Sequence, residues 1–150
     1  ASDVYKRQAI HIMLMASAFA QHDNQAIIGE IDAALEKAEW TKAEELIERM
    51  FKRYVRRHHI PGVSMGTLLF KKGWCELKQE KWAEARKSFE WCYKKYPDLK
   101  QNPHHHLALR GWADAAMGSG DVETAAKIYR KYIEEASKTD WSNPFAKTTR

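Results

Sequence analysis

The sequence predicts an all-α protein of about three stacked antiparallel helical hairpins, which together form a right-handed α-solenoid. The main observation is a four-residue phrase that ends in alanine and occurs three times, at residues 40–43, 82–85 and 122–125. The copies are 42 and 40 residues apart, and self-similarity with a period of about 20 to 50 residues is typical of helical repeat arrays. The second observation is that long stretches rich in Ala, Glu, Lys and Leu lie between only 4 prolines, which favours helices throughout.

The composition agrees with a single folded domain. The 150 residues are 44% hydrophobic and 30% charged, which is ordinary for a soluble folded chain and excludes a disordered one. The formal net charge is +5 at pH 7, and the basic residues are interleaved with glutamates. A charge of this size allows an acidic partner without requiring one.

The N-terminal residues are interpreted separately from the repeats. Residues 1–8, with the run from Asp3 to Gln8, resemble a translated sequencing adapter and are left out of the fold prediction. Residues 9–22 form an apolar run through Ala18-Phe19-Ala20, which has the small residues that signal peptidase requires. The run is either a truncated secretory signal or a helix of a preceding repeat, and it is too short to span a membrane. A signal predicts a location in the bacterial periplasm or cell envelope, and the alternative is cytoplasmic.

Residues 24–138 are expected to hold the repeats. In the first hairpin, apolar residues recur every three or four positions on both sides of a short turn, which predicts two amphipathic helices folded back on each other. The second hairpin is predicted from about Ser64 to Tyr96. The third is expected to start at Asn102, as the N-cap, with Pro103 at the first helical position. Residues 139–150 are a tail or the start of a further segment.

One motif in the second hairpin matches a known family. Gly73, the spacing Ala85-x-x-x-Phe89 and Pro97 follow the pattern of the tetratricopeptide repeat, so the chain resembles a divergent array of that family. Two departures are that Lys72 replaces the leucine expected before Gly73 and that Gly111 is two positions out of register. The residues expected in the repeat core are Ala43, Ile47, Gly73, Trp82, Ala85, Phe89, Ala125 and Tyr129.

The resemblance implies a non-catalytic scaffold that binds a peptide or a partner protein in a concave groove. The first helix of each hairpin lines that groove in the family. The positions that this implies as partner-binding residues are Phe70, Trp74, Lys78, Arg110, Asp114 and Met117. Aromatic and basic side chains at these positions favour an acidic segment as the partner.

Two other functions stay open at this point. The basic stretch from Arg49 to Arg57 is typical of a surface that neutralises phosphates, which would make the protein an RNA-binding helical repeat. Three large apolar residues that the core does not need, Trp91, Trp141 and Phe145, would allow self-association. No phosphate-binding loop or nucleophile motif is present, so an enzyme is not expected.

Histidines and cysteines are interpreted as structural. His104, His105 and His106 are consecutive, so at most two could share an ion, and no Cys or carboxylate stands at ligand spacing in the sequence. No metal or other cofactor is therefore expected. Cys75 and Cys92 are expected to be free thiols, because the hairpin places them far apart.

Overall fold

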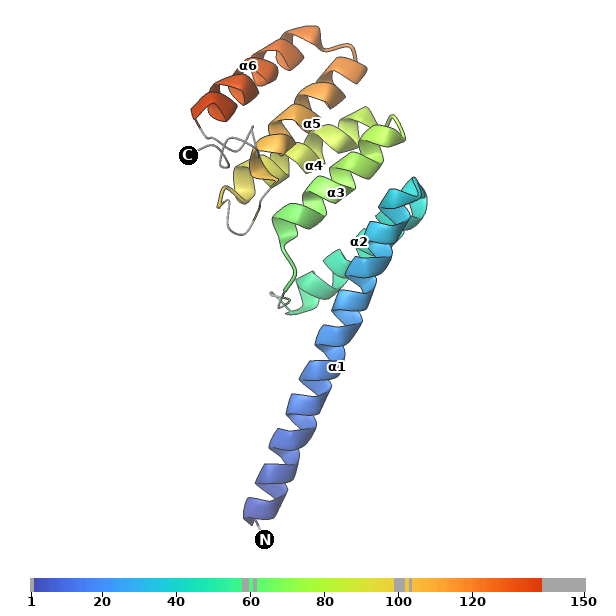
Figure 1. The fold of residues 1–150 in the computed structure, drawn as a ribbon, viewed down its shortest axis with the longest axis vertical. Helices are drawn as coiled ribbons and strands as arrows, with labels where there is room; N and C mark the ends of the chain where they lie inside the picture. Colours follow the sequence, from blue (N-terminus) through green and yellow to red (C-terminus); the bar gives the residue numbers. More distant parts are fainter. Residues whose placement is uncertain (1, 58–59, 61, 99–101, 103, 139–150) are drawn as a thin grey trace, which may run out of the picture. The chain divides into compact units, whose positions relative to one another are not determined.

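The protein is all-helical in the computed structural model, which describes residues 2–57, 60, 62–98, 102 and 104–138 (Figure 1). These residues form six α-helices and no strand, as predicted. The chain divides into two compact units, residues 1–63 and 64–150. The helices are α1 (Ser2–Glu36), α2 (Trp40–Arg57), α3 (Met65–Lys78), α4 (Trp82–Lys95), α5 (His105–Gly118) and α6 (Val122–Lys138).

The first unit is one hairpin of α1 and α2, which pack against each other. The predicted apolar faces are buried, with Ile27, Ile31 and Ala34 on α1 and Ala43, Ile47 and Met50 on α2. Helix α1 continues without a break through residues 9–22, and its side chains from residue 3 to residue 16 are exposed. Among the described residues, no helix is both long and apolar enough to cross a lipid bilayer.

The second unit consists of two hairpins, α3 with α4 and α5 with α6 (Figure 1). Helix α5 packs against both α4 and α3, so the two hairpins are stacked on each other. Ser64 starts α3, where its Oγ accepts a hydrogen bond from the Thr67 backbone N–H at 3.2 Å. Asp121 starts α6 in the same way, accepting from the Thr124 N–H at 3.2 Å. These caps satisfy N–H groups that have no partner inside the helix.

The repeat is visible in the backbone of its three hairpin turns. Each turn has one residue in the left-handed conformation, Ala38 (φ 56°), Glu80 (φ 59°) or Gly120 (φ 84°). Each stands two residues before a copy of the repeated phrase. The backbone N–H of the residue that follows donates a hydrogen bond of 2.9 Å to the carbonyl five residues before it. The three donor–acceptor pairs are Glu39–Ala34, Lys81–Glu76 and Asp121–Ala116. This is the Schellman geometry of a helix C-terminus, and it recurs with the periods of 42 and 40 residues.

The core of the second unit is built around Phe89, which is fully buried. Its ring lies against Gly73 of α3 and Gly111 of α5, and both glycines are too close to the ring to carry a side chain. Gly111 therefore has a packing role although it is out of register with the family pattern. The glycines let α3 and α5 approach the same aromatic ring of α4, which couples the two hairpins.

The other residues expected in the core follow the same layout. Ala85 and Ala125 are fully buried, whereas Trp82 and Tyr129 are only half-buried. Trp82 covers Gly118 at the end of α5, where a methyl group would lie 2.5 Å from the indole. Tyr129 packs against the cluster of Leu109, Ala113 and Ile128 in the third hairpin.

A buried ion pair accounts for Lys72, the other departure from the family pattern. Glu76 is fully buried in α3, and its Oε1 lies 2.7 Å from Lys72 Nζ. The same oxygen accepts a hydrogen bond from Ser88 Oγ of α4 at 2.7 Å. A buried carboxylate needs such partners to offset its loss of hydration, so Lys72 and Glu76 form one unit.

The predicted start of the third hairpin at Asn102 was wrong. Helix α5 begins at His105 with His104 as its N-cap, and Pro103 lies outside the described residues. Asn102 is fully buried, and its Nδ2 donates to the backbone carbonyls of Tyr96 (3.0 Å) and Cys92 (3.3 Å) at the end of α4. The side chain closes the preceding helix because the free carbonyls there attract its amide donors.

Candidate functional site

The predicted groove residues lie in two rows on α3 and α5, which contact each other. Phe70, Trp74 and Lys78 are spaced four residues apart on α3 and therefore share one face of it. Arg110, Asp114 and Met117 form the second row on α5, with spacings of four and three residues. Trp74, Lys78, Arg110 and Met117 are exposed, and we call these four the α3–α5 surface.

Phe70 and Asp114 are half-buried and interact mainly with the protein itself. The Phe70 ring stacks on His104 with centroids 4.6 Å apart and meets the edge of the buried Phe89 ring at 5.8 Å. Asp114 accepts a hydrogen bond from the hydroxyl of Tyr129. Burial and this carboxylate raise the pKa of Tyr129 to about 12. Both residues therefore contact other residues of the second unit and do not belong to the exposed α3–α5 surface.

The exposed part combines apolar area with positive charge. Trp74 is 38% exposed and Met117 45% exposed, and both are large enough to anchor a partner. Lys78 Nζ lies 4.8 Å from the centroid of the Trp74 ring, in the range of a cation–π contact. Arg110 is exposed on the neighbouring helix. This combination suits a segment that carries both an apolar side chain and carboxylates.

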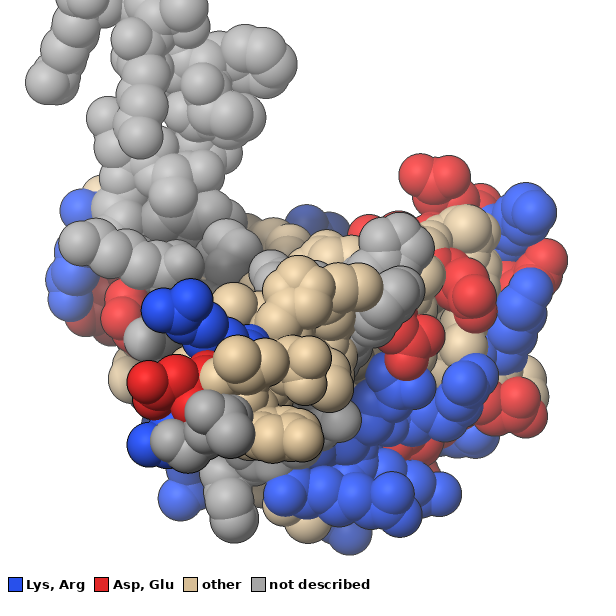
Figure 2. All heavy atoms as spheres, turned by 90° about the horizontal axis from the view of Figure 1, so that it is seen from below, with Lys and Arg blue, Asp and Glu red and all other residues tan. Residues whose placement is uncertain are grey.

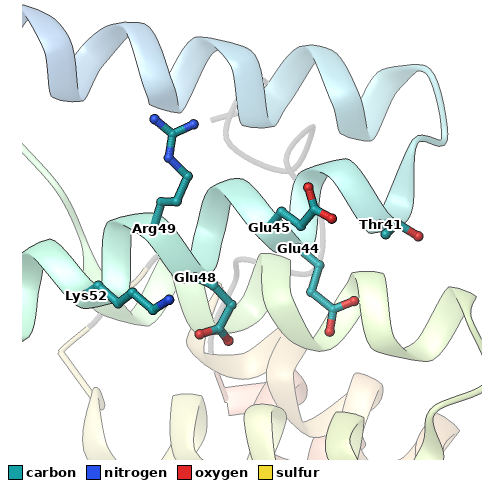
Figure 3. Close-up of a pocket in the computed structure, with 6 residues that line it drawn as sticks. All are labelled: Thr41, Glu44, Glu45, Glu48, Arg49 and Lys52. Atoms are coloured by element: carbon teal, nitrogen blue, oxygen red, sulfur yellow. The ribbon is translucent and has the colours of Figure 1, made fainter.

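The basic stretch of α2 is less available for phosphates than its sequence indicates. Arg53 donates to Asp23 (2.7 Å) and Asn24 (2.9 Å) of α1. A hollow of about 430 Å³ lies on α2, and its six lining residues are Thr41, Glu44, Glu45, Glu48, Arg49 and Lys52 (Figure 3). Three carboxylates against two basic groups do not form a phosphate site. Figure 2 shows a face of the molecule on which Lys and Arg gather over a broad area, with Asp and Glu mostly along its edges.

The self-association residues are only partly described. Trp91 is 56% exposed on α4, whereas Trp141 and Phe145 lie outside the described residues. Cys75 and Cys92, which were expected to be too far apart for a disulfide, are both buried, and neither takes part in a disulfide among the described residues.

The histidines have a neighbour that their spacing in the sequence did not indicate. No carboxylate stands at ligand spacing from His105 and His106 in the sequence, but Glu135 of α6 brings its Oε2 to 3.2 Å from His106 Nδ1. Tyr93 of α4 donates its hydroxyl to Glu135 Oε1 at 2.5 Å and stacks on His105. Sequence reasoning missed this cluster because its members come from three helices, and only the adjacent histidines gave a signal.

A comparison with protein families finds one match in the repeat region. Residues 70–140 match the model of a tetratricopeptide repeat. These residues belong to the tetratricopeptide repeat family. Comparisons with curated proteins and with solved structures give no match. The match covers the tetratricopeptide hairpins from within α3 to the end of α6, and therefore both rows of the α3–α5 surface.

The family assignment carries a general function. Tetratricopeptide repeats generally mediate protein–protein interaction or serve as scaffolds, and they are typically non-catalytic. The first hairpin, in α1 and α2, lies before the matched residues. Its turn nevertheless has the same Schellman hydrogen bond as the two tetratricopeptide turns.

Proposed function

We propose that this protein is a non-catalytic interaction module whose α3–α5 surface binds a partner segment that carries an apolar anchor and acidic residues. The observation that carries the proposal is the exposure of Trp74 (38%) and Met117 (45%) on two contacting helices, with Lys78 and Arg110 beside them. Exposed apolar side chains that form a contiguous patch mark protein–protein interaction sites. Trp and Arg are also enriched among residues that dominate binding energy.

The chemistry of the partner follows from the charges. Lys78 and Arg110 are exposed cations, and Asp114 is engaged with Tyr129. Carboxylates on the partner would meet two exposed positive groups, and Asp114 is the one negative group among the six predicted groove residues. Attraction between opposite charges raises the association rate, and salt screens this attraction. Binding should therefore be strongest at low ionic strength.

The test begins with a displayed library of random peptides selected on the full chain. Enriched peptides should combine an apolar residue with Asp or Glu. By fluorescence anisotropy, Trp74→Ala and Arg110→Ala should each weaken their binding at least tenfold, which corresponds to about 1.4 kcal/mol. Trp91→Ala is the matched control, because Trp91 is also an exposed tryptophan but lies on α4.

Two outcomes would overturn the proposal. If Trp91→Ala weakens peptide binding and Trp74→Ala does not, the binding face lies on α4. That result would favour self-association, and light scattering would then show a dimer. Selective retention of RNA, lost steeply as salt is raised, would favour the nucleic-acid alternative. The engaged Arg53 and the acidic residues of the α2 hollow speak against that second outcome.

We also propose an envelope location, supported by the exposed apolar side chains of Ile10, Ile12, Met13, Leu14 and Met15. A run of this kind suits recognition by the secretory machinery. Fusion of alkaline phosphatase to the end of the full chain in a bacterial host tests it, because the reporter is active only after export. A fusion that stays inactive while the protein is made at normal levels would support the cytoplasmic alternative.

A further inference from the structure

Helices α5 and α6 bring two buried histidines and a carboxylate together outside the α3–α5 surface. His105 and His106 are the first two residues of α5, and Glu135 lies near the end of α6. The histidines are 7% and 9% exposed, and Glu135 is half-buried. One ligand atom from each of the three residues lies within 4.8 Å of the other two. Three donor atoms at this spacing, shielded from water, can converge on one ion.

Neighbouring side chains orient the carboxylate and one of the imidazole rings. Tyr93 stacks on His105 with centroids 4.5 Å apart, and its hydroxyl occupies Glu135 Oε1. The other carboxylate oxygen, Oε2, therefore faces His106, at 3.2 Å from Nδ1. A hydrogen bond to the second oxygen of a carboxylate ligand is the usual way in which proteins orient such a ligand. Tyr93 would serve this positioning role.

A buried polar atom without a partner is the second observation at this cluster. The buried Nδ1 of His105 has no hydrogen-bond partner within the described residues, which is costly without a ligand.

We propose that His105, His106 and Glu135 bind a divalent transition metal ion of the Zn²⁺ class. Imidazole nitrogen and carboxylate oxygen suit Zn²⁺ and its neighbours, whereas Ca²⁺ and Mg²⁺ prefer oxygen alone. In a tetrahedral site with bonds of about 2.0–2.1 Å, ligand atoms stand about 3.4 Å apart. His106 Nδ1 and Glu135 Oε2 lie 3.2 Å apart, and the ligand atom of His105 lies within 4.8 Å of the other two. Binding would draw His105 closer and replace the hydrogen bond between His106 and Glu135. The ion would join the first turn of α5 to the last turns of α6.

Lys131 of α6 provides a charge test of this assignment. Its Nζ lies 4.9 Å from the centroid of the Tyr93 ring, and Tyr93 contacts both His105 and Glu135. A second cation close to these groups should repel a metal ion. Lys131→Gln is therefore expected to tighten metal binding, by about two- to fivefold at low salt, because the side chain is solvent-exposed.

The experiment uses the full chain without a polyhistidine tag. Titration with Co²⁺, followed by visible absorption, and with Zn²⁺, followed by calorimetry, should show saturation at one ion per chain. Glu135→Gln keeps the size of the side chain and should weaken binding at least tenfold. His104→Ala is the matched control, because His104 neighbours the site in sequence but stacks on Phe70, and it should leave the affinity unchanged.

The results that overturn the proposal are equally specific. Absence of saturable binding by the folded wild-type chain at 100 µM metal, on the order expected for the weakest useful sites, would reject the site. Equal loss of affinity in His104→Ala and Glu135→Gln would show adventitious binding by a run of histidines. Far-UV circular dichroism of each variant verifies folding, and Zn²⁺ should raise the melting temperature of wild type but not of Glu135→Gln.

Discussion

Gly111 gives the strongest test of how the two tetratricopeptide hairpins are joined. In Gly111→Ala, the new methyl carbon would lie 2.5 Å from Cε1 and Cζ of Phe89 and 2.8 Å from Cδ1. Ordinary carbon–carbon contacts are about 3.5–4.0 Å, so the ring would have to move by about 1 Å. It has little room, because Gly73 lies close to the same three ring atoms, and a methyl group there would already be 2.9 Å from Cε1. The substitution must therefore strain the α4–α5 interface.

The magnitude follows from two opposing effects. Alanine in place of glycine inside a helix stabilises by about 0.8–1.0 kcal/mol. Overpacking a filled core costs about 1–3 kcal/mol, and the fully buried Phe89 with three ring atoms in collision places Gly111→Ala at the upper end. The net expectation is a loss of about 1–2 kcal/mol, which lowers the melting temperature by about 4–8 °C per kcal/mol for a unit of this size.

The assay is urea denaturation followed by circular dichroism at 222 nm, with Gly29→Ala as the matched control. Gly29 also lies inside a helix, but a methyl group there would meet nothing within 4 Å, so this variant should gain about 1 kcal/mol. In a Phe89→Leu background, Gly111→Ala should lose at least 1 kcal/mol less than in wild type, because the shorter side chain removes the collision. Stabilisation by Gly111→Ala as large as that by Gly29→Ala would contradict the expected collision with Phe89.

Two further predictions concern pH and capping. Burial raises the pKa of Cys92 from 9.0 to about 11, so its contribution to stability is complete below pH 9 and is lost as the pH rises toward 11. Urea denaturation at pH 8 and pH 11 should show wild type losing about 2 kcal/mol more than Cys92→Ala, and equal losses would reject the assigned cause. Ser64→Ala removes the hydrogen bond from the Thr67 N–H and should lower the free energy of unfolding by about 1 kcal/mol. Ser64→Asp can still accept this hydrogen bond and should keep most of the stability. If urea denaturation shows no loss of stability in Ser64→Ala, the cap is dispensable.

Much of the fold was predictable because each hairpin repeats the same short sequence pattern at its turn and along its helices. The turns need one left-handed residue each, and Ala38, Glu80 and Gly120 stand at the same place in each copy of the pattern. The apolar spacing of the helices then determines which faces are buried. For the same reason the exposure of Trp74 and Met117 follows from their position on the first helices of the hairpins.

The contacts between hairpins were not predictable from the pattern. Gly111 is out of register because the repeat is counted within one hairpin, whereas Gly111 packs against Phe89 of the preceding hairpin. The loop before α5 is another example. Asn102 was expected to cap α5, but its amide donates to the carbonyls of Cys92 and Tyr96 at the end of α4. Propensity favours asparagine at both kinds of position, so the sequence alone does not distinguish them.

The histidine cluster shows the same limit most clearly and explains what the site depends on. Glu135 is 29 residues from His106, and no spacing rule connects the start of one helix with the end of the next. Their distance depends on the turn at Gly120 and on the residue at which α5 begins, which is His105. A change that shifts α5 by one residue would rotate His105 and His106 by about 100° and separate them from Glu135. The start of α5 and the turn before α6 therefore decide together whether the proposed metal site can form.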